Sequence, residues 1–384
     1  MKLSLKNAAL LLAVITLSIA YILGSTKKGT QIVSQLQKFI PQNSEIFKIS
    51  NNPLLFEAHN KGTGKTLIYI VVEKAQGWGG PLKLATITDS KGIITQIVVL
   101  EYKETPSFFH KIQNHKFFQQ FIGKKVSDPL SIGQDIDTVT QATISSKAVT
   151  EAVRKGSHSI GRKILKFPFK GAERKWKFGI REVILLSLYM LMFIDLKLNL
   201  KILRYFILGT TFIFLGFYLN AAISIGNISA LFFGFIPPLK ENIFWWMLIF
   251  GALSFPLILK RNLYCYYLCP FGALQEFTAK ISGINLKLNK KNLILTKYLA
   301  YFLTWLALII TFLTLNPALG AYEPFATFFR AEGMNIQWYI MPAVILGSFF
   351  SRRLFCRAFC PVGVLLSVLL KIRSKFDSII NRLK

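Results

Sequence analysis

Residues 265–270 read Cys265-Tyr266-Tyr267-Leu268-Cys269-Pro270, and residues 356–361 repeat the pattern as Cys356-Arg357-Ala358-Phe359-Cys360-Pro361. These two hooks contain all four cysteines of the chain, and each follows a hydrophobic stretch. Together they offer four thiolates, the number that holds an iron–sulfur cluster or a tetrahedral zinc ion. We therefore predict that all four cysteines are metal ligands or redox thiols: Cys265, Cys269, Cys356 and Cys360. The simpler alternative is that they are small apolar residues at helix ends.

The composition is that of a membrane protein. Mean hydropathy is +0.44, and 52% of the 384 residues are hydrophobic. A helix that spans a hydrocarbon core about 30 Å thick needs roughly 17 to 25 apolar residues. About six segments are predicted to be transmembrane helices: Ala8–Leu23, Ile180–Ile194, Ile202–Leu219, Ile243–Leu259, Leu295–Leu315 and Trp338–Phe350. The stretch 221–236 is apolar but contains glycine and serine, so we expect a re-entrant or interfacial piece there.

The distribution of lysine and arginine predicts the orientation. Loops 196–204 and 260–297 and the tail 352–384 carry 18 basic residues, whereas the intervening loops hold only Lys240 and Arg330. Because short cytoplasmic loops are enriched in basic residues, we expect both hooks and the C-terminus in the cytoplasm. A single N-terminal span then places the soluble region on the outer side of the cytoplasmic membrane. Ten basic residues within 153–181 oppose this assignment, but long exported domains follow the charge rule less strictly.

Four parts are expected along the chain. Residues 1–26 form a membrane anchor or a cleaved signal peptide, 45–158 an extracytoplasmic domain, 159–178 a basic linker, and 179–384 a five-helix, all-α membrane domain. The net charge of +29 is divided between the linker and the loops beside the lipid bilayer, where basic residues meet anionic headgroups. Because no helix-turn-helix or RNA-binding signature accompanies this charge, nucleic acid is not expected as a partner.

The soluble region is expected to be an α+β domain. Residues 67–72, 82–87 and 93–102 have the composition of strands in a small antiparallel sheet. Helices are expected at 117–122 and 145–155. The start of the second helix follows a hydroxyl-rich segment, where backbone N–H groups and the helix dipole favour an anion such as phosphate. Simple helix capping by Thr143 or Ser145 explains the same composition.

This hydroxyl-rich segment resembles the flavinylation motif of FMN-binding domains in membrane redox complexes, Asp-x-x-(Ser/Thr)-Gly-Ala-Thr. The resemblance implies that a flavin transferase joins FMN to Thr143 through a phosphoester. It departs from the motif at Gln141, where glycine is usual. The residues implied to surround the attachment point or to guide the transferase are Asp137, Thr140, Ala142 and Ser145. Two further segments that lie near the flavin in this family are matched by Gly79 and Gly80 and by Glu104 and Thr105.

The membrane part resembles the NosR/NirI family, which includes the accessory flavoproteins of reductive dehalogenase systems. The resemblance covers about residues 60 to 370 and is carried by Cys265–Phe277, Asn220–Ser224 and Ala321–Phe325 together with the flavinylation motif. It implies an electron-transfer protein with an iron–sulfur cluster at the cytoplasmic side and FMN in the 45–158 domain. The expected partner is an extracytoplasmic reductase or electron carrier of a respiratory system.

This scheme separates the two redox groups by a bilayer about 30 Å thick, so an intermediate carrier is expected. All four histidines fall in the exported part, which argues against a b-type haem in the spans. A quinone, a second flavin or a partner subunit remains as the carrier. Basic residues beside the hooks are expected to raise the potential of a cluster or to lower the thiol pKa values; they are Arg352, Arg353 and Arg357.

Two other classes of function remain open. Pairs of cysteines in this spacing also occur in membrane proteins that handle copper, and copper(I) favours thiolates. The chain is then a maturation, regulatory or copper-handling protein that uses the cysteine pairs as metal-binding or redox thiols. A transporter with incidental cysteines is the third alternative.

Overall fold

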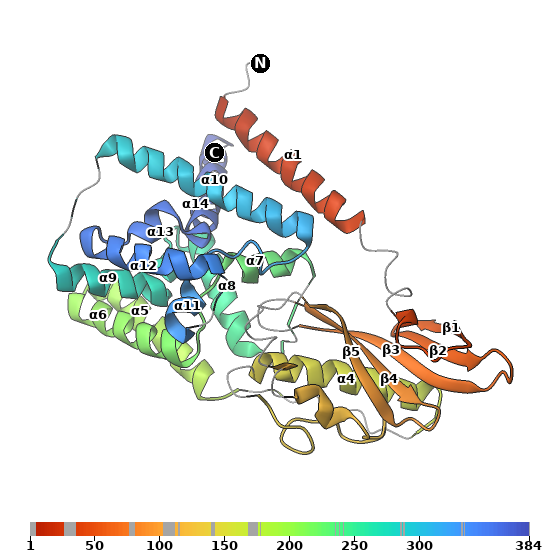
Figure 1. Cartoon of the computed structure of the whole chain (residues 1–384). Coiled ribbons are helices and arrows are strands. Elements are labelled where there is room, and N and C mark those ends of the chain that lie inside the picture. The colour runs from red at the N-terminus through yellow and green to blue at the C-terminus, as the bar shows by residue number, and fades with distance from the viewer. Residues whose placement is uncertain are drawn as a thin grey trace.

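The structure is a computed structural model of the chain. It describes residues 5–26, 36–76, 81–102, 112–113, 116–139, 143–167, 176, 178–234, 236–237, 239–240, 242–284, 286, 289–331, 333 and 335–383. A sheet domain follows the first helix, and the remainder of the described chain is mostly helical (Figure 1). The expected combination of an α+β domain and a helical part is thus observed.

The sheet is an antiparallel meander in which neighbours in sequence are neighbours in space. Its strands are β1 (Ser44–Asn51), β2 (Leu54–Asn60), β3 (Thr66–Gln76), β4 (Pro81–Asp89) and β5 (Ile94–Tyr102). The three predicted strands correspond to β3, β4 and β5. Strands β1 and β2 were not predicted, because β1 is an edge strand whose apolar Phe47 and Ile49 are exposed and whose pairing contains a bulge.

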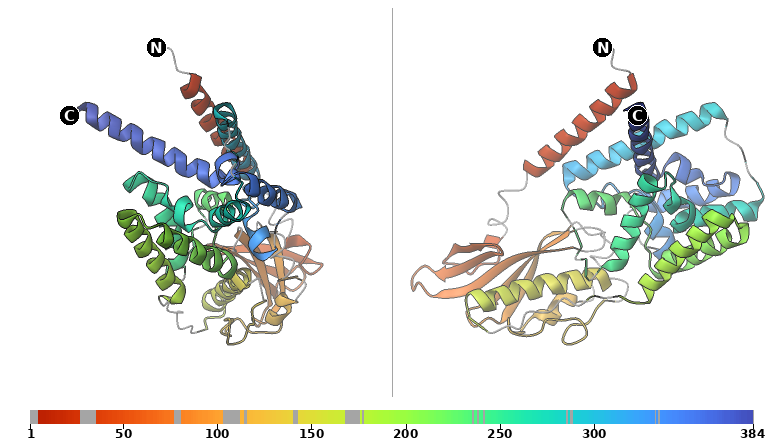
Figure 2. Two further views of the ribbon diagram at one scale, coloured as in Figure 1. Left: turned by 90° about the vertical axis from the view of Figure 1, so that its left-hand side faces the viewer. Right: turned by 180° about the vertical axis from the view of Figure 1, so that it is seen from behind.

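Helix α4 (Thr143–Lys163) covers one face of the sheet (Figure 2). Val153 of this helix and Leu84 of β4 belong to one fully buried cluster. Gly156 permits the close approach, since a Cβ atom there would lie 2.8 Å from Cγ1 of Val71. The helix extends past residue 158, and a short 3₁₀ helix, η1 (Phe117–Phe121), lies near the predicted position 117–122.

The opposite face of the sheet carries a second, smaller core. Ile70 and Val72 of β3 and Ile87 of β4 pack there with Leu36, which precedes the sheet. Alternate residues of β3 thus face two different cores, as the period of two along a strand requires. Strand β3 is therefore buried on both sides, which explains its high proportion of valine and isoleucine.

Helices form the chain from residue 180 onward. They are α5 (Ile180–Leu198), α6 (Lys201–Thr210) with its π-helical continuation η2 (Thr211–Tyr218), α7 (Ile225–Phe232), α8 (Ile243–Ile258), the π-helical turn η3 (Tyr264–Leu268), α9 (Pro270–Ser282), α10 (Lys290–Thr314), α11 (Phe325–Arg330), α12 (Asn335–Phe350), α13 (Leu354–Ala358) and α14 (Pro361–Leu383). Each of the six predicted membrane segments falls on a helix, the first being α1 (Leu5–Thr26).

Two helices of the described chain are long and apolar enough to cross a membrane, Lys201–Tyr218 and Ile294–Thr314. Three further apolar helices are shorter: Leu10–Ser25, Ile243–Ile258 and Ile336–Phe350. The count of six spans therefore stays a prediction. The expected re-entrant stretch 221–236 contains the eight-residue helix α7, of which five residues are buried.

Helices α1 and α10 lie side by side and run in the same direction (Figure 1). The indole N–H of Trp305 donates a hydrogen bond to the hydroxyl of Thr16 at 3.0 Å. Further along both helices, Tyr21 packs edge-on against Phe312 with ring centroids 6.0 Å apart. The contact brings the N-terminal ends of both helices to the same side of the molecule.

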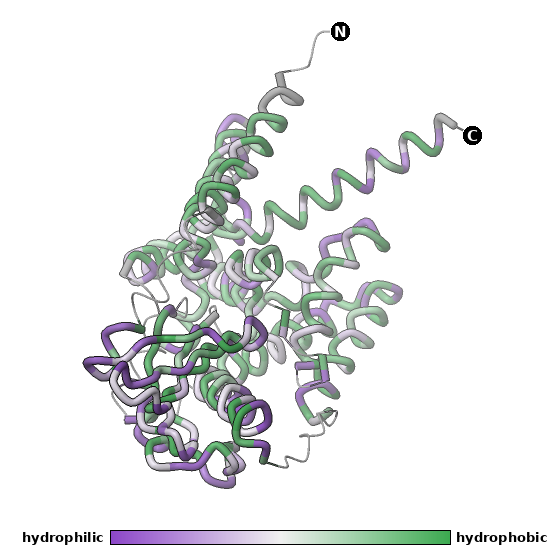
Figure 3. Tube along the Cα trace, turned by 90° about the vertical axis from the view of Figure 1, so that its right-hand side faces the viewer, coloured by the Kyte–Doolittle hydropathy of each residue, from purple (hydrophilic) through white to green (hydrophobic). Residues whose placement is uncertain are grey.

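The C-terminal tail forms α14, a helix that was not predicted from the sequence. Apolar residues alternate along it with charged ones such as Lys371 and Asp377, whereas α1 and α10 are apolar over long stretches (Figure 3). Helix α14 packs against α8, and Lys260 forms an ion pair of 2.8 Å with Asp377 near the end of that contact. The sequence pattern that indicates this helix is an amphipathic periodicity of apolar residues, not a continuous apolar run.

Candidate functional site

The two hooks meet at one cavity of about 420 Å³. All four predicted sulfur ligands line it, and none of them is in a disulfide. The second cysteine of each hook, Cys269 or Cys360, is buried, whereas the first, Cys265 or Cys356, is half-buried. The structure therefore brings together residues that lie about 90 positions apart in the sequence.

Both hooks are built in the same way. Cys269 immediately precedes α9, and its Sγ accepts a hydrogen bond from the N–H of Gly272 at 3.4 Å. Cys360 and Gly363 repeat this contact at 3.4 Å at the start of α14. A Cβ atom on Gly272 would lie 3.2 Å from the carbonyl oxygen of Cys265, so glycine leaves room for the turn of the hook. The helix N-terminus and its free N–H groups favour negative charge on the sulfur.

Two side chains join the hooks to each other. The amide of Gln275 donates to Sγ of Cys356 at 3.0 Å, and its oxygen accepts the N–H of Phe355 at 2.9 Å. Arg353, which precedes the second hook, donates to the carbonyl oxygen of Cys265 at 2.9 Å. Gln275 was not predicted as a site residue; its signal was a single amide in the otherwise apolar start of α9.

Three arginines converge on the buried carboxylate of Glu276. The ion pairs measure 2.7 Å to Arg204, 2.8 Å to Arg353 and 3.0 Å to Arg352. Burial alone would raise the pKa of Glu276, but the hydrogen bonds and charges of these arginines lower it below its ordinary value. The carboxylate is therefore ionised and balances part of the arginine charge that was expected to act on the sulfurs.

The thiol pKa values differ from the expectation that nearby arginines lower them. Burial raises the pKa of Cys356 to about 12, and charge repulsion between neighbouring sulfurs adds to this effect. The pKa values of the other three thiols are raised by burial as well. The desolvation of the cavity thus outweighs the attraction of Arg353, and a bound cation must displace the thiol protons.

The donor set fits a cluster better than a single ion. Among the described residues, no three side chains of His, Cys, Asp or Glu are close enough to hold one metal ion. The four cysteines instead line one cavity, two from each hook. Cysteine ligands of an iron–sulfur cluster bind different iron atoms and are spaced accordingly. Cys265, Cys269, Cys356 and Cys360 are the residues that would hold it.

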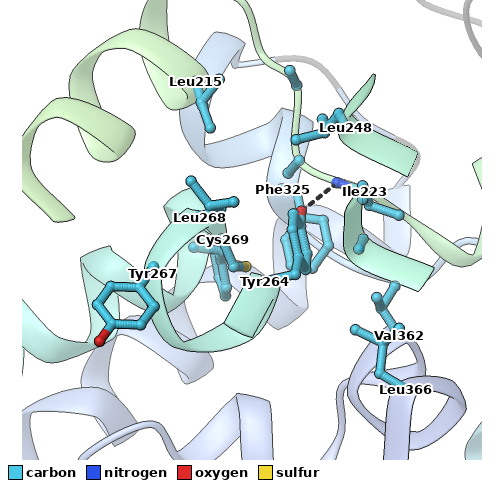
Figure 4. Packing of buried hydrophobic residues seen from close by; sticks show 14 of the residues in the cluster. Leu215, Ile223, Leu248, Tyr264, Tyr267, Leu268, Cys269, Phe325, Val362 and Leu366 are labelled. Atoms are coloured by element: carbon cyan, nitrogen blue, oxygen red, sulfur yellow. Dashed lines mark hydrogen bonds between the residues drawn. The ribbon is translucent and has the colours of Figure 1, made fainter. Parts of the chain in front are cut away.

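Segments predicted on the opposite side of the membrane form the floor of the cavity. The hydroxyl of Tyr264 accepts the backbone N–H of Ile223 at 2.9 Å (Figure 4). The hydroxyl of Tyr322 donates to the carbonyl oxygen of Phe359 at 2.5 Å, and Phe325 lines the cavity itself. The two other stretches that carried the family resemblance thus contact the hooks or their immediate neighbours: 220–224 bonds to Tyr264, next to the first hook, and 321–325 bonds to Phe359 in the second.

The first hook lies beside the middle of a long apolar helix. Thr211 is near the centre of Lys201–Tyr218, and its hydroxyl donates to the carbonyl oxygen of Tyr267 at 3.1 Å. Tyr267 is two residues from Cys269. The first hook thus contacts the middle of this helix rather than one of its ends.

The predicted flavin segment is described only in part. Asp137 is exposed, and its backbone N–H donates to the side-chain oxygen of Gln120 at 2.8 Å. Thr143 is the first residue of α4, and Ser145 is buried two residues later. The remaining predicted flavin residues lie outside the described part of the chain: Gly79, Gly80, Glu104, Thr105, Thr140 and Ala142. The role of Gln120 in holding the segment had no recognisable signal in the sequence.

Comparison with known proteins separates the chain into two matched parts. Residues 77–157 match the FMN-binding domain family, and residues 242–289 and 339–378 match a 4Fe-4S binding domain that contains both hooks. One component of an ion-translocating oxidoreductase complex from Methanosarcina acetivorans is 30% identical over 127 residues, which are 32% of this chain and 68% of that protein.

Two further relatives match the same chain. The regulatory protein NosR of Stutzerimonas stutzeri is 26% identical over 216 residues, which are 51% of this chain and 30% of NosR. The protein NirI of Paracoccus denitrificans is 27% identical over 183 residues, which are 43% of this chain and 26% of NirI. The chain is a NosR/NirI-like membrane flavoprotein. Its FMN-binding domain belongs to the same family as the Methanosarcina oxidoreductase component.

The residues of this NosR/NirI-like flavoprotein that match NosR or NirI cover less than a third of the length of either relative. The matches support FMN and an iron–sulfur cluster as its cofactors and membrane electron transfer as its general activity. The expected resemblance to the NosR/NirI family is thereby confirmed.

Replacement of Gln275 by leucine is expected to lower the midpoint potential of the cysteine centre. The substitution removes an N–H donor to Cys356, and hydrogen bonds to sulfur raise cluster potentials. A bond worth about 1 to 2 kcal/mol corresponds to a shift of roughly 40 to 90 mV for a one-electron couple. Redox titration followed by EPR measures the shift.

Thr278→Val is the matched control, because the Thr278 hydroxyl bonds only to carbonyls of its own helix. The control should leave the potential unchanged. Equal potentials for the Gln275→Leu and unmodified proteins would show that the amide does not act on the sulfur.

Proposed function

We propose that this NosR/NirI-like flavoprotein passes electrons across the cytoplasmic membrane between a cytoplasmic-side iron–sulfur cluster and an extracytoplasmic FMN, and serves a respiratory reductase. The observation that carries the proposal is the shared cavity, in which four cysteines of two hooks meet Ile223 and Phe325 from the loops that the charge distribution assigns to the outer side. When bound, the cluster exchanges single electrons and FMN exchanges one or two.

The position of the cavity shortens the electron path. Thr211, near the middle of the apolar helix Lys201–Tyr218, contacts the first hook, and Ile223, from a loop assigned to the outer side by its charge, contacts Tyr264 just before it. We infer that the cluster is set into the cytoplasmic half of the membrane, which leaves less than the full bilayer thickness of about 30 Å to be crossed. A quinone or a partner subunit then needs to carry the electron over the remaining part only.

The protein residues hold the cluster environment fixed. Gln275 and Arg353 link the two hooks, and Glu276 holds Arg353 in place. Such an arrangement changes little when the charge of the centre changes, which favours rapid electron transfer because few groups need to reorganise. The apolar floor around Phe325 excludes water from the outer side of the centre.

The arrangement of the helices supports the proposed six-span topology. Helices α1 and α10 are parallel, and lysines stand at the start of both, Lys6 in α1 and Lys290 in α10. Both starts are then at the cytoplasmic side, and the sheet domain after α1 is exported. The packing of α1 against α10 also supports a retained anchor rather than a cleaved signal peptide.

The flavin is proposed to be attached covalently at Thr143. The exposed Asp137 at the start of the motif is accessible to a flavin transferase, and Gln120 holds its backbone. The sheet domain contains no cysteine in its sequence, so its export requires no disulfide.

Flavin attachment is tested by in-gel fluorescence after SDS denaturation of protein produced together with a flavin transferase. The unmodified chain is expected to fluoresce, and Thr143→Ala to lose at least nine-tenths of the signal because the acceptor oxygen is absent. Thr138→Ala removes a hydroxyl at a position of the same motif where any residue is allowed, so this variant should keep the fluorescence. A fluorescent Thr143→Ala band would contradict attachment at this residue.

Electron transfer is tested in sealed inverted membrane vesicles, in which the hooks face the bulk solution. A membrane-impermeant reductant added outside is expected to reduce flavin in the lumen, as measured by flavin absorbance. Cys360→Ser is expected to slow this reduction at least tenfold, because it removes a buried sulfur of the centre. Thr278→Val serves as the folding control, and equal rates for Cys360→Ser and the unmodified protein would refute the proposal.

A further inference from the structure

The mouth of the cysteine cavity has a distinct rim. We call the residues Arg352, Arg353, Arg357 and Tyr266 the arginine rim; all of them line the cavity. The half-buried cysteines Cys265 and Cys356 lie beside the rim, whereas the second cysteine of each hook is buried below. The accessible edge of the sulfur centre is therefore at the rim.

The arginine rim carries an excess of positive charge. Glu276 is the sole acidic residue of 260–297, and its carboxylate already faces three arginines. Asp377 is the sole acidic residue of 351–384, and it is paired with Lys260 and Arg373. Arg357 is exposed next to Cys356, and no carboxylate of these two segments is left to balance it.

The rim is also held in a fixed shape. Arg353 donates to the carbonyl oxygens of Cys265 and Tyr266 at 2.9 and 3.1 Å, and Glu276 holds its Nε. The guanidinium groups of Arg204 and Arg353 lie 4.0 and 5.6 Å from the ring centroid of Tyr266. The ring remains 43% exposed. Rigid tyrosine and arginine side chains are typical of protein interfaces, where they lose little conformational entropy on binding.

We propose that the arginine rim is the docking surface for a small acidic one-electron carrier protein. The inference rests on the cysteine centre of the proposed function. One electron passes from the reduced carrier to the centre held by the hooks; the carrier is oxidised by one electron and the centre is reduced by one. No bond is broken and no proton is transferred. Opposite charge steers the acidic face of the carrier to the accessible edge of the centre.

A protein fits the rim better than a lipid headgroup does. Headgroups need only mobile basic side chains at the membrane surface, as lysines flanking a span provide. Here Arg352 and Arg353 are fixed by Glu276 and surround the exposed edge of a redox cavity. Because their positions are fixed, these arginines can match the acidic groups on the surface of a folded protein. Binding of lipid headgroups is one of the outcomes that the experiment distinguishes.

Binding is tested with the full chain in nanodiscs of neutral phosphatidylcholine. The probe is an acidic plant-type [2Fe–2S] ferredoxin, and Kd is measured by biolayer interferometry at low and high salt. Arg357→Glu is expected to weaken binding at least tenfold, and high salt should weaken binding to the unmodified chain by a similar factor. Lys375→Glu makes the same charge change at an exposed position of α14 away from the cavity, and should change Kd less than twofold.

The result has clear alternatives. Equal Kd values for the Arg357→Glu and Lys375→Glu proteins, or binding insensitive to salt, overturn the proposal. Tight binding of phosphatidylglycerol at the rim that excludes ferredoxin also overturns it and assigns the rim to lipid. If Arg357→Glu loses iron, the Arg352→Gln protein is measured instead, because Glu276 keeps its ion pairs with Arg204 and Arg353 in that variant. The Kd of the Arg352→Gln protein for ferredoxin should rise several-fold. An unchanged Kd overturns the proposal.

The docking proposal and the proposed function fail in different ways. If a chemical reductant at the hook side reduces the flavin but ferredoxin neither binds nor reduces the centre, the docking proposal is wrong and the function stands. If ferredoxin binds at the rim and reduces the centre but the flavin stays oxidised, the transmembrane function is wrong and the docking surface stands. EPR of the centre and flavin absorbance read the two steps separately.

Discussion

The exchange of side chains between the two hooks is the interaction on which the membrane part depends. Gln275 follows the first hook and bonds to the sulfur of Cys356 in the second, while Arg353 precedes the second hook and bonds to the carbonyl of Cys265 in the first. Gln275 is completely buried, so each of its bonds is made in the absence of competing water. This exchange helps to hold the four sulfurs around one cavity. The charge and the access of the site follow from that shared cavity.

Charge around this contact is balanced by Glu276. A buried carboxylate is costly unless it is paired, and here three arginines pair it. The same carboxylate fixes the arginines that define the mouth of the cavity. The site is thus closed at its floor by aromatic side chains and open at its cationic rim. This asymmetry suits a centre that receives electrons from one side and passes them to the other.

The sequence predicted the parts of this site better than their arrangement. Repeated cysteine spacing predicted that the four cysteines act together, and they line one cavity; alternation of apolar residues identified β3 to β5. Both patterns are local. Three long-range contacts could not be predicted: Gln275 with Cys356, Tyr264 with Ile223, and Tyr322 with Phe359. The loops of Ile223 and Tyr322 were assigned to the outer face by charge counting alone, which gives the side of a loop but not how deeply it returns into the protein. Edge strand β1 and amphipathic α14 were missed because their apolar residues are interrupted by polar ones.

The central claim is that two hooks hold one centre. Iron and acid-labile sulfide analysis of anaerobically purified protein, with both Cys356 and Cys360 replaced by serine, tests it most directly. We predict that the unmodified protein contains one cluster per chain and that the double variant loses essentially all of its iron and sulfide, because the first hook alone cannot retain the cluster. Retention of half of the bound metal by the double variant, or copper without sulfide in the unmodified protein, would contradict the account.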